Sequence, residues 1–128
     1  MSSVKIIKSN IIENNGLIME VRAVTKYVRI SPEKARQIAR LLQGKKVTDA
    51  LGIVDLIPRK AARLMAKTLR SAVANAENNF DLDRDNLTVK EATVGVAPTM
   101  KRFRPRARGM AGKILKRTSH FQIVLTND

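Results

Sequence analysis

The chain has 128 residues and carries 25 lysines and arginines against 11 aspartates and glutamates, for a formal net charge of +14 at pH 7. This length suffices for one domain with an ordinary hydrophobic core. The lack of cysteine excludes disulfide frameworks and thiolate metal sites, and no run approaches the roughly 20 apolar residues of a membrane span. We therefore expect a soluble intracellular protein that does not contact a membrane.

The first 18 residues differ in character from the rest of the chain. They are polar, rich in asparagine and without a sustained hydrophobic period, and a second methionine, Met19, stands where the organised pattern begins. We expect residues 1–18 to form a flexible N-terminal extension and residues 19–128 to form a single domain. From Met19 to Ile30, β-branched residues and partial alternation predict a strand.

Three helices are predicted after that strand. Ser31 and Pro32 form a start signal, with a hydroxyl to cap free amides and a proline where no donor is needed, and Gly44 marks the end. A second helix is expected from Thr48 to Ile57, and the third and longest from about Pro58 to Asn78. The third helix has an apolar stripe at Ala61, Leu64, Met65, Thr68, Leu69, Ala72 and Ala76, and a basic ridge at Lys60, Arg63, Lys67 and Arg70.

Two long β-like stretches follow, from Leu87 to about Ala97 and from Lys113 to Leu125, and they enclose a segment rich in proline, glycine and arginine. Strands of that length reach roughly 40 Å at about 3.4 Å per residue, whereas a domain of this size has a radius of gyration near about 14 Å. The hairpin over about 87–125 therefore cannot be wholly covered. We expect its tip, about 98–112, to project as an arm while its base forms part of the sheet.

Positive charge is concentrated in this arm. Residues 92–127 are 36 consecutive positions without a carboxylate. Solvated surfaces usually mix both signs, so an acid-free basic run is suited to lie against dense negative charge, most commonly a nucleic-acid backbone. The predicted phosphate-binding residues of the arm are Lys101, Arg102, Arg104, Arg106, Arg108, Lys113, Lys116 and Arg117.

Two further basic groups are candidates for the same contact. One is the ridge of the third helix, and the other is formed by Arg36 and Arg40 on the first helix.

Aromatic residues are scarce, with one tyrosine, three phenylalanines and no tryptophan. Because single-stranded bases are usually read by stacking on aromatic faces, recognition through backbone and shape is favoured.

The remaining motifs do not indicate a metal site or an active site. Asp81, Asp83 and Asp85 resemble the opening of a calcium loop, but the sixth position is Asn86 and the twelfth is Ala92, where glycine and glutamate are required. His120 is the only histidine, and no nucleophile, base and orienting group can be assembled around it. We expect no enzyme activity, no metal and no cofactor.

Four stretches of the chain resemble the family of bacterial-type large-subunit ribosomal protein twenty-two. The resemblance extends from Met19 to the C-terminus, whereas residues 1–18 depart from the family pattern, so nothing transfers to them. The matching stretches are Val28–Arg36 (VRISPEKAR), Ala72–Asn79 (AVANAENN), Pro98–Gly109 (PTMKRFRPRARG) and Ile114–His120 (ILKRTSH).

The resemblance implies a fold, a function and a location in the ribosome. The fold is α+β, with three helices packed on a three-stranded antiparallel sheet and a long projecting basic β-hairpin. The function is that of a structural constituent of the large ribosomal subunit, in the cytoplasm or an organelle, which binds 23S rRNA and acts early in assembly. The globular part would lie near the peptide exit tunnel outlet and the hairpin would line the tunnel wall.

The same resemblance implies partners and tip residues. Besides rRNA, the partners would be neighbouring large-subunit proteins such as protein four, and the nascent peptide, with no homo-oligomer. An alternative from another class is an architectural DNA-binding protein with a basic β-arm, although such proteins are intertwined dimers that kink duplex DNA. The tunnel-lining tip would comprise Met100, Lys101, Arg102, Phe103, Arg104 and Pro105.

Overall fold

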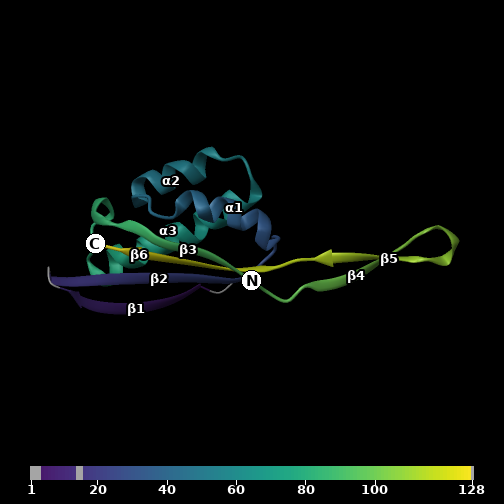
Figure 1. The fold of residues 1–128 in the computed structure, drawn as a ribbon, viewed down its shortest axis with the longest axis horizontal. Helices are drawn as coiled ribbons and strands as arrows, with labels where there is room; N and C mark the ends of the chain where they lie inside the picture. The colour runs from purple at the N-terminus through teal and green to yellow at the C-terminus, as the bar shows by residue number, and fades with distance from the viewer. Residues whose placement is uncertain (1–3, 14–15, 128) are drawn as a thin grey trace.

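The computed structural model describes residues 4–13 and 16–127 and combines a helix-covered antiparallel sheet with a separate two-stranded arm (Figure 1). The sheet has the strand order β1-β2-β6-β3, and the arm pairs β4 with β5. The sheet strands are β1 (Val4–Glu13), β2 (Gly16–Val28), β3 (Thr88–Val96) and β6 (Ser119–Thr126), and the arm strands are β4 (Met100–Pro105) and β5 (Ala111–Lys116).

Three helices lie on one face of the sheet, as predicted: α1 (Pro32–Leu42), α2 (Val47–Leu56) and α3 (Lys60–Phe80) (Figure 1). α1 and α3 contact the strands, and α2 packs on both of these helices. None of the helices in the described part of the chain is long and apolar enough to cross a membrane.

The helix ends agree with the predicted signals in part. Gly44 has φ +78°, a conformation that glycine adopts without strain, and it ends α1 as expected. Ser31 is the N-cap residue of α1, but its side chain makes no capping hydrogen bond, so the predicted hydroxyl cap is wrong. α3 starts at Lys60 rather than Pro58, because Arg59 is still extended at φ −122° and ψ 148°.

The core lies between the helices and the inner face of the sheet. Leu69 of α3, Leu42 of α1 and Phe121 of β6 are fully buried, and each such side chain contributes about 1.5–3 kcal/mol on burial. The Thr68 hydroxyl forms a buried hydrogen bond with the Thr25 hydroxyl at 2.9 Å, which satisfies both groups between α3 and β2. The predicted stripe of α3 is buried throughout, except that Leu64 is half-buried at the edge of the core.

The sheet has four strands rather than the expected three, because β1 lies in the stretch expected to be a flexible extension. β1 pairs with β2 from Val4↔Thr25 to Glu13↔Gly16. Adjacent isoleucines interrupt its alternation in the sequence, so no period-two pattern identifies it. β2 supplies the hydrogen-bonding edge, and β propensity depends strongly on such a neighbour.

The arm leaves the end of the sheet where β3 ends and β6 begins (Figure 1). The strand expected over about 87–97 corresponds to β3, whereas the strand expected over 113–125 is divided into β5 and β6 at this joint. β4 lies in the segment expected to be the tip. Pro98 has no amide hydrogen to donate, so the ladder is broken there. The joint is held instead by the Thr118 hydroxyl, which donates to the Pro98 carbonyl at 2.6 Å, and by the Ala97 amide, which donates to the Thr118 carbonyl at 3.2 Å.

The arm should be dispensable for folding, because it is exposed and its strands pair only with each other. Replacing Met100–Lys116 by two glycines should leave the far-ultraviolet circular dichroism of a folded domain and change the free energy of unfolding by less than about 1 kcal/mol. The control Leu69→Ala should lower it by about 2–5 kcal/mol. An unfolded spectrum for the deletion would contradict this assignment of the core.

An ion pair on the helix-free face of the sheet makes stability depend on pH. Lys90 of β3 pairs with Glu20 of β2, whose side chain is buried. This hydrogen bond is the main cause that raises the pKa of Lys90 above its ordinary value of 10.5, against a smaller opposing effect of desolvation. Because the folded pKa is the higher one, the stabilisation is fully present below pH 10.5 and is lost as pH rises through the folded pKa.

Lys90→Met should therefore lower the melting temperature at neutral pH, because the buried Glu20 carboxylate loses its partner. The difference from the unsubstituted protein should stay constant up to about pH 10.5 and narrow as pH rises through the folded pKa of Lys90. Thermal melts across this range measure it, with Lys113→Met as the control, since Lys113 has no ion pair among the described side chains. If the difference in melting temperature between the two proteins did not change with pH, the ion pair of Lys90 with Glu20 would not be the source of the stabilisation.

Candidate nucleic-acid interface

The register of the arm separates its positive charges. In five successive cross-strand pairs, one partner is basic and the other is uncharged, so no two cations lie directly opposite each other. Like charges in directly opposite positions destabilise a sheet, so this register lets a two-stranded ribbon carry many cations. The pairs are Met100↔Lys116, Lys101↔Leu115, Arg102↔Ile114, Phe103↔Lys113 and Arg104↔Gly112.

The arm cations have no ion-pair partner among the side chains that the structure describes. All residues from 101 to 110 are exposed, as are Lys113, Lys116 and Arg117. Three ion pairs occur among the described side chains, and all three lie in the globular part. The structure therefore places all eight predicted arm residues on one projecting and unneutralised element.

The tip is closed by a short turn that uses left-handed backbone. The Arg106 amide donates to the Met110 carbonyl at 2.7 Å, and Arg108 and Gly109 have φ of +64° and +69°. The Arg106 side chain crosses over Gly112, where a Cβ atom would meet its Nε at 2.3 Å. The close approach to Gly112 is therefore made by a side chain of the same arm.

Most of the predicted helical cations are exposed, and one of them forms an ion pair. Lys60, Arg63 and Lys67 are exposed along α3, but Arg70 pairs with Asp55 at 2.5 Å. Arg40 is exposed on α1.

Arg36 has a different position from the other cations of α1. Its Nε donates to the Val94 carbonyl at 3.4 Å and thus ties α1 to β3. The fold also brings Arg36 and Arg117 together around one hollow at the base of the arm, although they are far apart in the sequence. Arg36 and Arg117 could therefore act together at the arm base.

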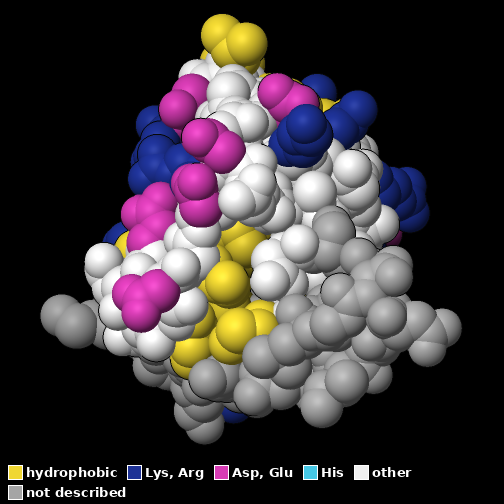
Figure 2. All heavy atoms as spheres, turned by 90° about the vertical axis from the view of Figure 1, so that its left-hand side faces the viewer, with side chains coloured by type: hydrophobic (Ala, Val, Ile, Leu, Met, Phe, Trp, Pro, Cys, Tyr) yellow, Lys and Arg dark blue, Asp and Glu magenta, His cyan; other side chains and the backbone are white. Residues whose placement is uncertain are grey.

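Acidic side chains gather at the opposite end of the domain. Viewed from that end, they form a band along one side, with hydrophobic side chains beside it (Figure 2). The turn that carries Asp81, Asp83 and Asp85 precedes β3, whereas the arm begins after β3, so the two lie at opposite ends of the sheet. Charge is therefore distributed unevenly along the molecule, with an arm that carries cations and no carboxylate and a far end where carboxylates lie among lysines and arginines (Figure 2).

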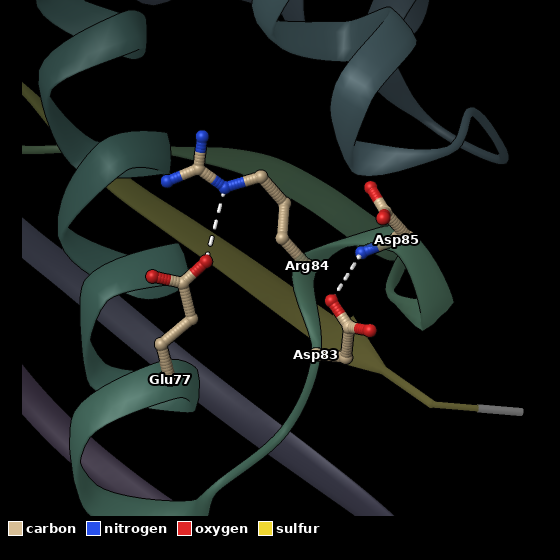
Figure 3. Close-up of polar contacts among 4 residues, drawn as sticks. All are labelled: Glu77, Asp83, Arg84 and Asp85. Atoms are coloured by element: carbon tan, nitrogen blue, oxygen red, sulfur yellow. Dashed lines mark hydrogen bonds and ion pairs between the residues drawn. The ribbon is translucent and has the colours of Figure 1, made fainter.

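The acidic turn is held by its own hydrogen bonds. The Asp83 carboxylate accepts from the Asp85 amide at 3.2 Å, and Arg84 Nε lies 3.0 Å from Glu77 Oε1 on α3 (Figure 3). Across residues 4–13 and 16–127, no group of three or more potential metal ligands is found. The bond from the Asp85 amide to the Asp83 carboxylate is that of an Asx turn, in which an aspartate side chain binds the backbone two residues further on.

His120 has a partner that the sequence did not reveal. Its Nδ1 accepts a hydrogen bond from the Tyr27 amide at 3.1 Å, and the two ring centroids are 4.9 Å apart with an interplanar angle of 85°. The two residues are 93 positions apart, and only the pairing of β2 with β6 brings them together. No sequence pattern signals this contact.

The chain is similar to known proteins over most of its length. The family model described as ribosomal protein L22p/L17e matches residues 23–126. The large ribosomal subunit protein uL22 of Halothermothrix orenii is 55% identical over 108 residues, which cover 84% of this chain and 96% of that protein. The proteins of the same name from Syntrophobacter fumaroxidans and Opitutus terrae are 56% and 54% identical, over 84% and 85% of this chain and 97% and 96% of their own lengths.

The arm should dominate binding to structured RNA. Changing Arg102, Arg104 and Lys113 together to glutamine should weaken affinity by about tenfold or more, because each removes a cation that releases a counterion on binding. The same change at Lys60, Arg63 and Lys67 should weaken it less. Filter binding at fixed salt measures both, and thermal melts should show both variants folded. Equal losses would contradict the assignment of the arm as the main contact.

Proposed function

The chain belongs to the ribosomal protein L22p/L17e family, and on this premise we propose that its arm penetrates large-subunit 23S rRNA and lines the wall of the peptide exit tunnel. As a member of this family, it is a structural constituent of the large ribosomal subunit and works within the ribosome in the cytoplasm. The family is structural, so no catalytic role is assigned. The alternative of an architectural DNA-binding protein does not fit this membership.

One observation carries the proposal, namely eight exposed arm cations with no carboxylate partner among the described side chains. Such an element is stable against a dense array of phosphates, since neutralisation releases the counterions condensed on RNA. Arginine supplies five of the eight positions, and its planar fork suits bidentate contact with phosphate. The arm therefore supplies both the charge and the donor geometry for rRNA.

The shape of the arm supports insertion rather than surface contact. A two-stranded ribbon can enter a groove of nucleic acid about 12 Å wide, and at about 3.4 Å per residue it reaches farther for its length than a helix. RNA that surrounds such an arm has to fold with the arm already present. This ordering is the physical reason to propose that the protein acts early in subunit assembly.

The polarity of the molecule supports an orientation for the globular part. Its far end carries carboxylates among its cations and so attracts phosphate less than the arm end, which carries cations alone. The globular part would then lie at the surface of the subunit, near the tunnel outlet, with the carboxylates facing away from rRNA. The tip residues would face the tunnel, where large-subunit protein four and the nascent peptide are the proposed neighbours.

A photo-crosslinking amino acid placed at Phe103 tests this orientation, because Phe103 is at the tip and 70% exposed. In purified large subunits with a stalled nascent chain, we expect crosslinks from position 103 to tunnel rRNA and to the nascent peptide. The matched control is position 56, since Leu56 is 83% exposed and belongs to α2 of the globular part rather than to the arm.

Position 56 should give no crosslink to the nascent chain. Sequencing of the bound RNA and mass spectrometry of the peptide identify the partners at both positions. Crosslinks from position 103 only to neighbouring globular proteins, or equal nascent-chain crosslinks from both positions, would contradict the tunnel orientation.

A further inference from the structure

A β-bulge at the base of the arm carries the only tyrosine of the chain. β2 and β6 are paired at Thr25↔Phe121 and again at Val28↔Ser119, so two residues of β2 lie opposite the single residue His120. The second of the two, Tyr27, has φ +58°, which is uncommon for a bulky side chain. Bulges re-aim side chains next to functional sites, and strained backbone persists where the surrounding structure holds it.

The bulge exposes the aromatic ring and the neighbouring ring fixes its direction. Tyr27 is 59% exposed, although aromatic residues are usually more deeply buried. His120 contacts it in a perpendicular arrangement and accepts its backbone amide hydrogen, so both ends of the residue are held. Because a perpendicular contact covers at most one face of a ring, a face of Tyr27 remains open.

The opposite neighbour of His120 leaves room for a flat ligand. Gly95 of β3 is paired directly with His120 and is exposed. A Cβ added at Gly95 would meet nothing closer than 3.9 Å, so the position has space for a side chain and carries none. The helix-free face of the sheet therefore has an open surface beside Tyr27 and His120.

The residues around Tyr27 favour a nucleotide as the occupant. Lys26 precedes Tyr27, and the exposed Arg29 follows directly after the end of β2, so two cations are close to Tyr27 in the sequence. Arg117 lies two residues before Ser119, the pairing partner of Val28. An exposed aromatic face with basic neighbours is the arrangement that binds unpaired bases, with the ring stacking and the cations contacting phosphate.

We propose that Tyr27 and His120 form a stacking site for one unpaired nucleobase of large-subunit rRNA at the base of the arm. This inference rests on the proposed function, and it adds a base-stacking site to a protein that is otherwise expected to recognise phosphate and shape. A flat base can stack on the exposed ring of Tyr27 without backbone hydrogen bonds, whereas a peptide added as a strand would pair along an edge such as β3 rather than stack on the ring.

Tyr27→Leu measures the stacking, because leucine keeps an apolar side chain at the same backbone position without an aromatic face. We expect affinity for 23S rRNA transcript to fall between about 5-fold and about 150-fold, the usual cost of losing one stacked base, with the slope of affinity against salt unchanged. Tyr27→Phe should restore binding. Gly95→Leu should also weaken binding by filling the space beside His120, and thermal melts establish that each variant is folded.

A second measurement uses the fact that the chain has one tyrosine and no tryptophan. Incorporated 3-fluorotyrosine gives a single ¹⁹F signal, which should shift with oligoadenylate and not with an abasic oligomer of equal length and charge. Unchanged affinity for Tyr27→Leu, or an equal ¹⁹F shift with the abasic oligomer, would overturn the stacking site. Failure of the unsubstituted protein to bind 23S rRNA would instead overturn the proposed function on which the site rests.

Discussion

The structure depends on one electrostatic constraint, the lack of internal counter-charge for the arm. Eight cations lie on a ribbon that contains no carboxylate, and the ion pairs found among the described side chains are all in the globular part. In isolation these charges repel each other and stay in water, where each costs little. Against a polyphosphate they become the source of affinity, which is why a segment that contributes little to the core is central to the function.

The rest of the fold makes such an arm possible. The cross-strand register puts an uncharged residue opposite each strand cation, which limits repulsion within the ribbon. At the joint, hydrogen bonds from Thr118 and Ala97 replace the ladder that Pro98 interrupts, and the buried Ser119 hydroxyl donates to the Ile30 carbonyl at 2.7 Å. The arm is thus anchored to the core at its base and free of it beyond, with the acidic turn at the far end of the sheet.

The sequence predicted the elements whose signals are local and missed those that depend on distant partners. The helices were predicted to within about two residues, because Pro32 and Gly44 act through their own backbone restrictions. The arm followed from strand length and charge alone. β1 was missed because its pairing edge is supplied by β2, and the break between β5 and β6 within the strand expected over 113–125 was missed as well.

The candidate site shows the same division between local and distant information. All eight arm cations were identified from the absence of nearby carboxylates, and the structure exposes every one. The engagement of Arg70 by Asp55 and of Arg36 by the Val94 carbonyl depends on packing between elements, so residue type could not reveal it. The contact of Tyr27 with His120 depends on strand register and a bulge, which are properties of the folded sheet.

The most direct test of the central claim is the salt dependence of binding to 23S rRNA by the whole chain. If the arm cations are neutralised by phosphate, a plot of log affinity against log salt should have a slope of about −6 to −7, from eight cations that each release roughly 0.7–0.9 counterions. A slope near zero would contradict the account, because it would mean that the arm cations remain in water or find their counter-charge within the protein.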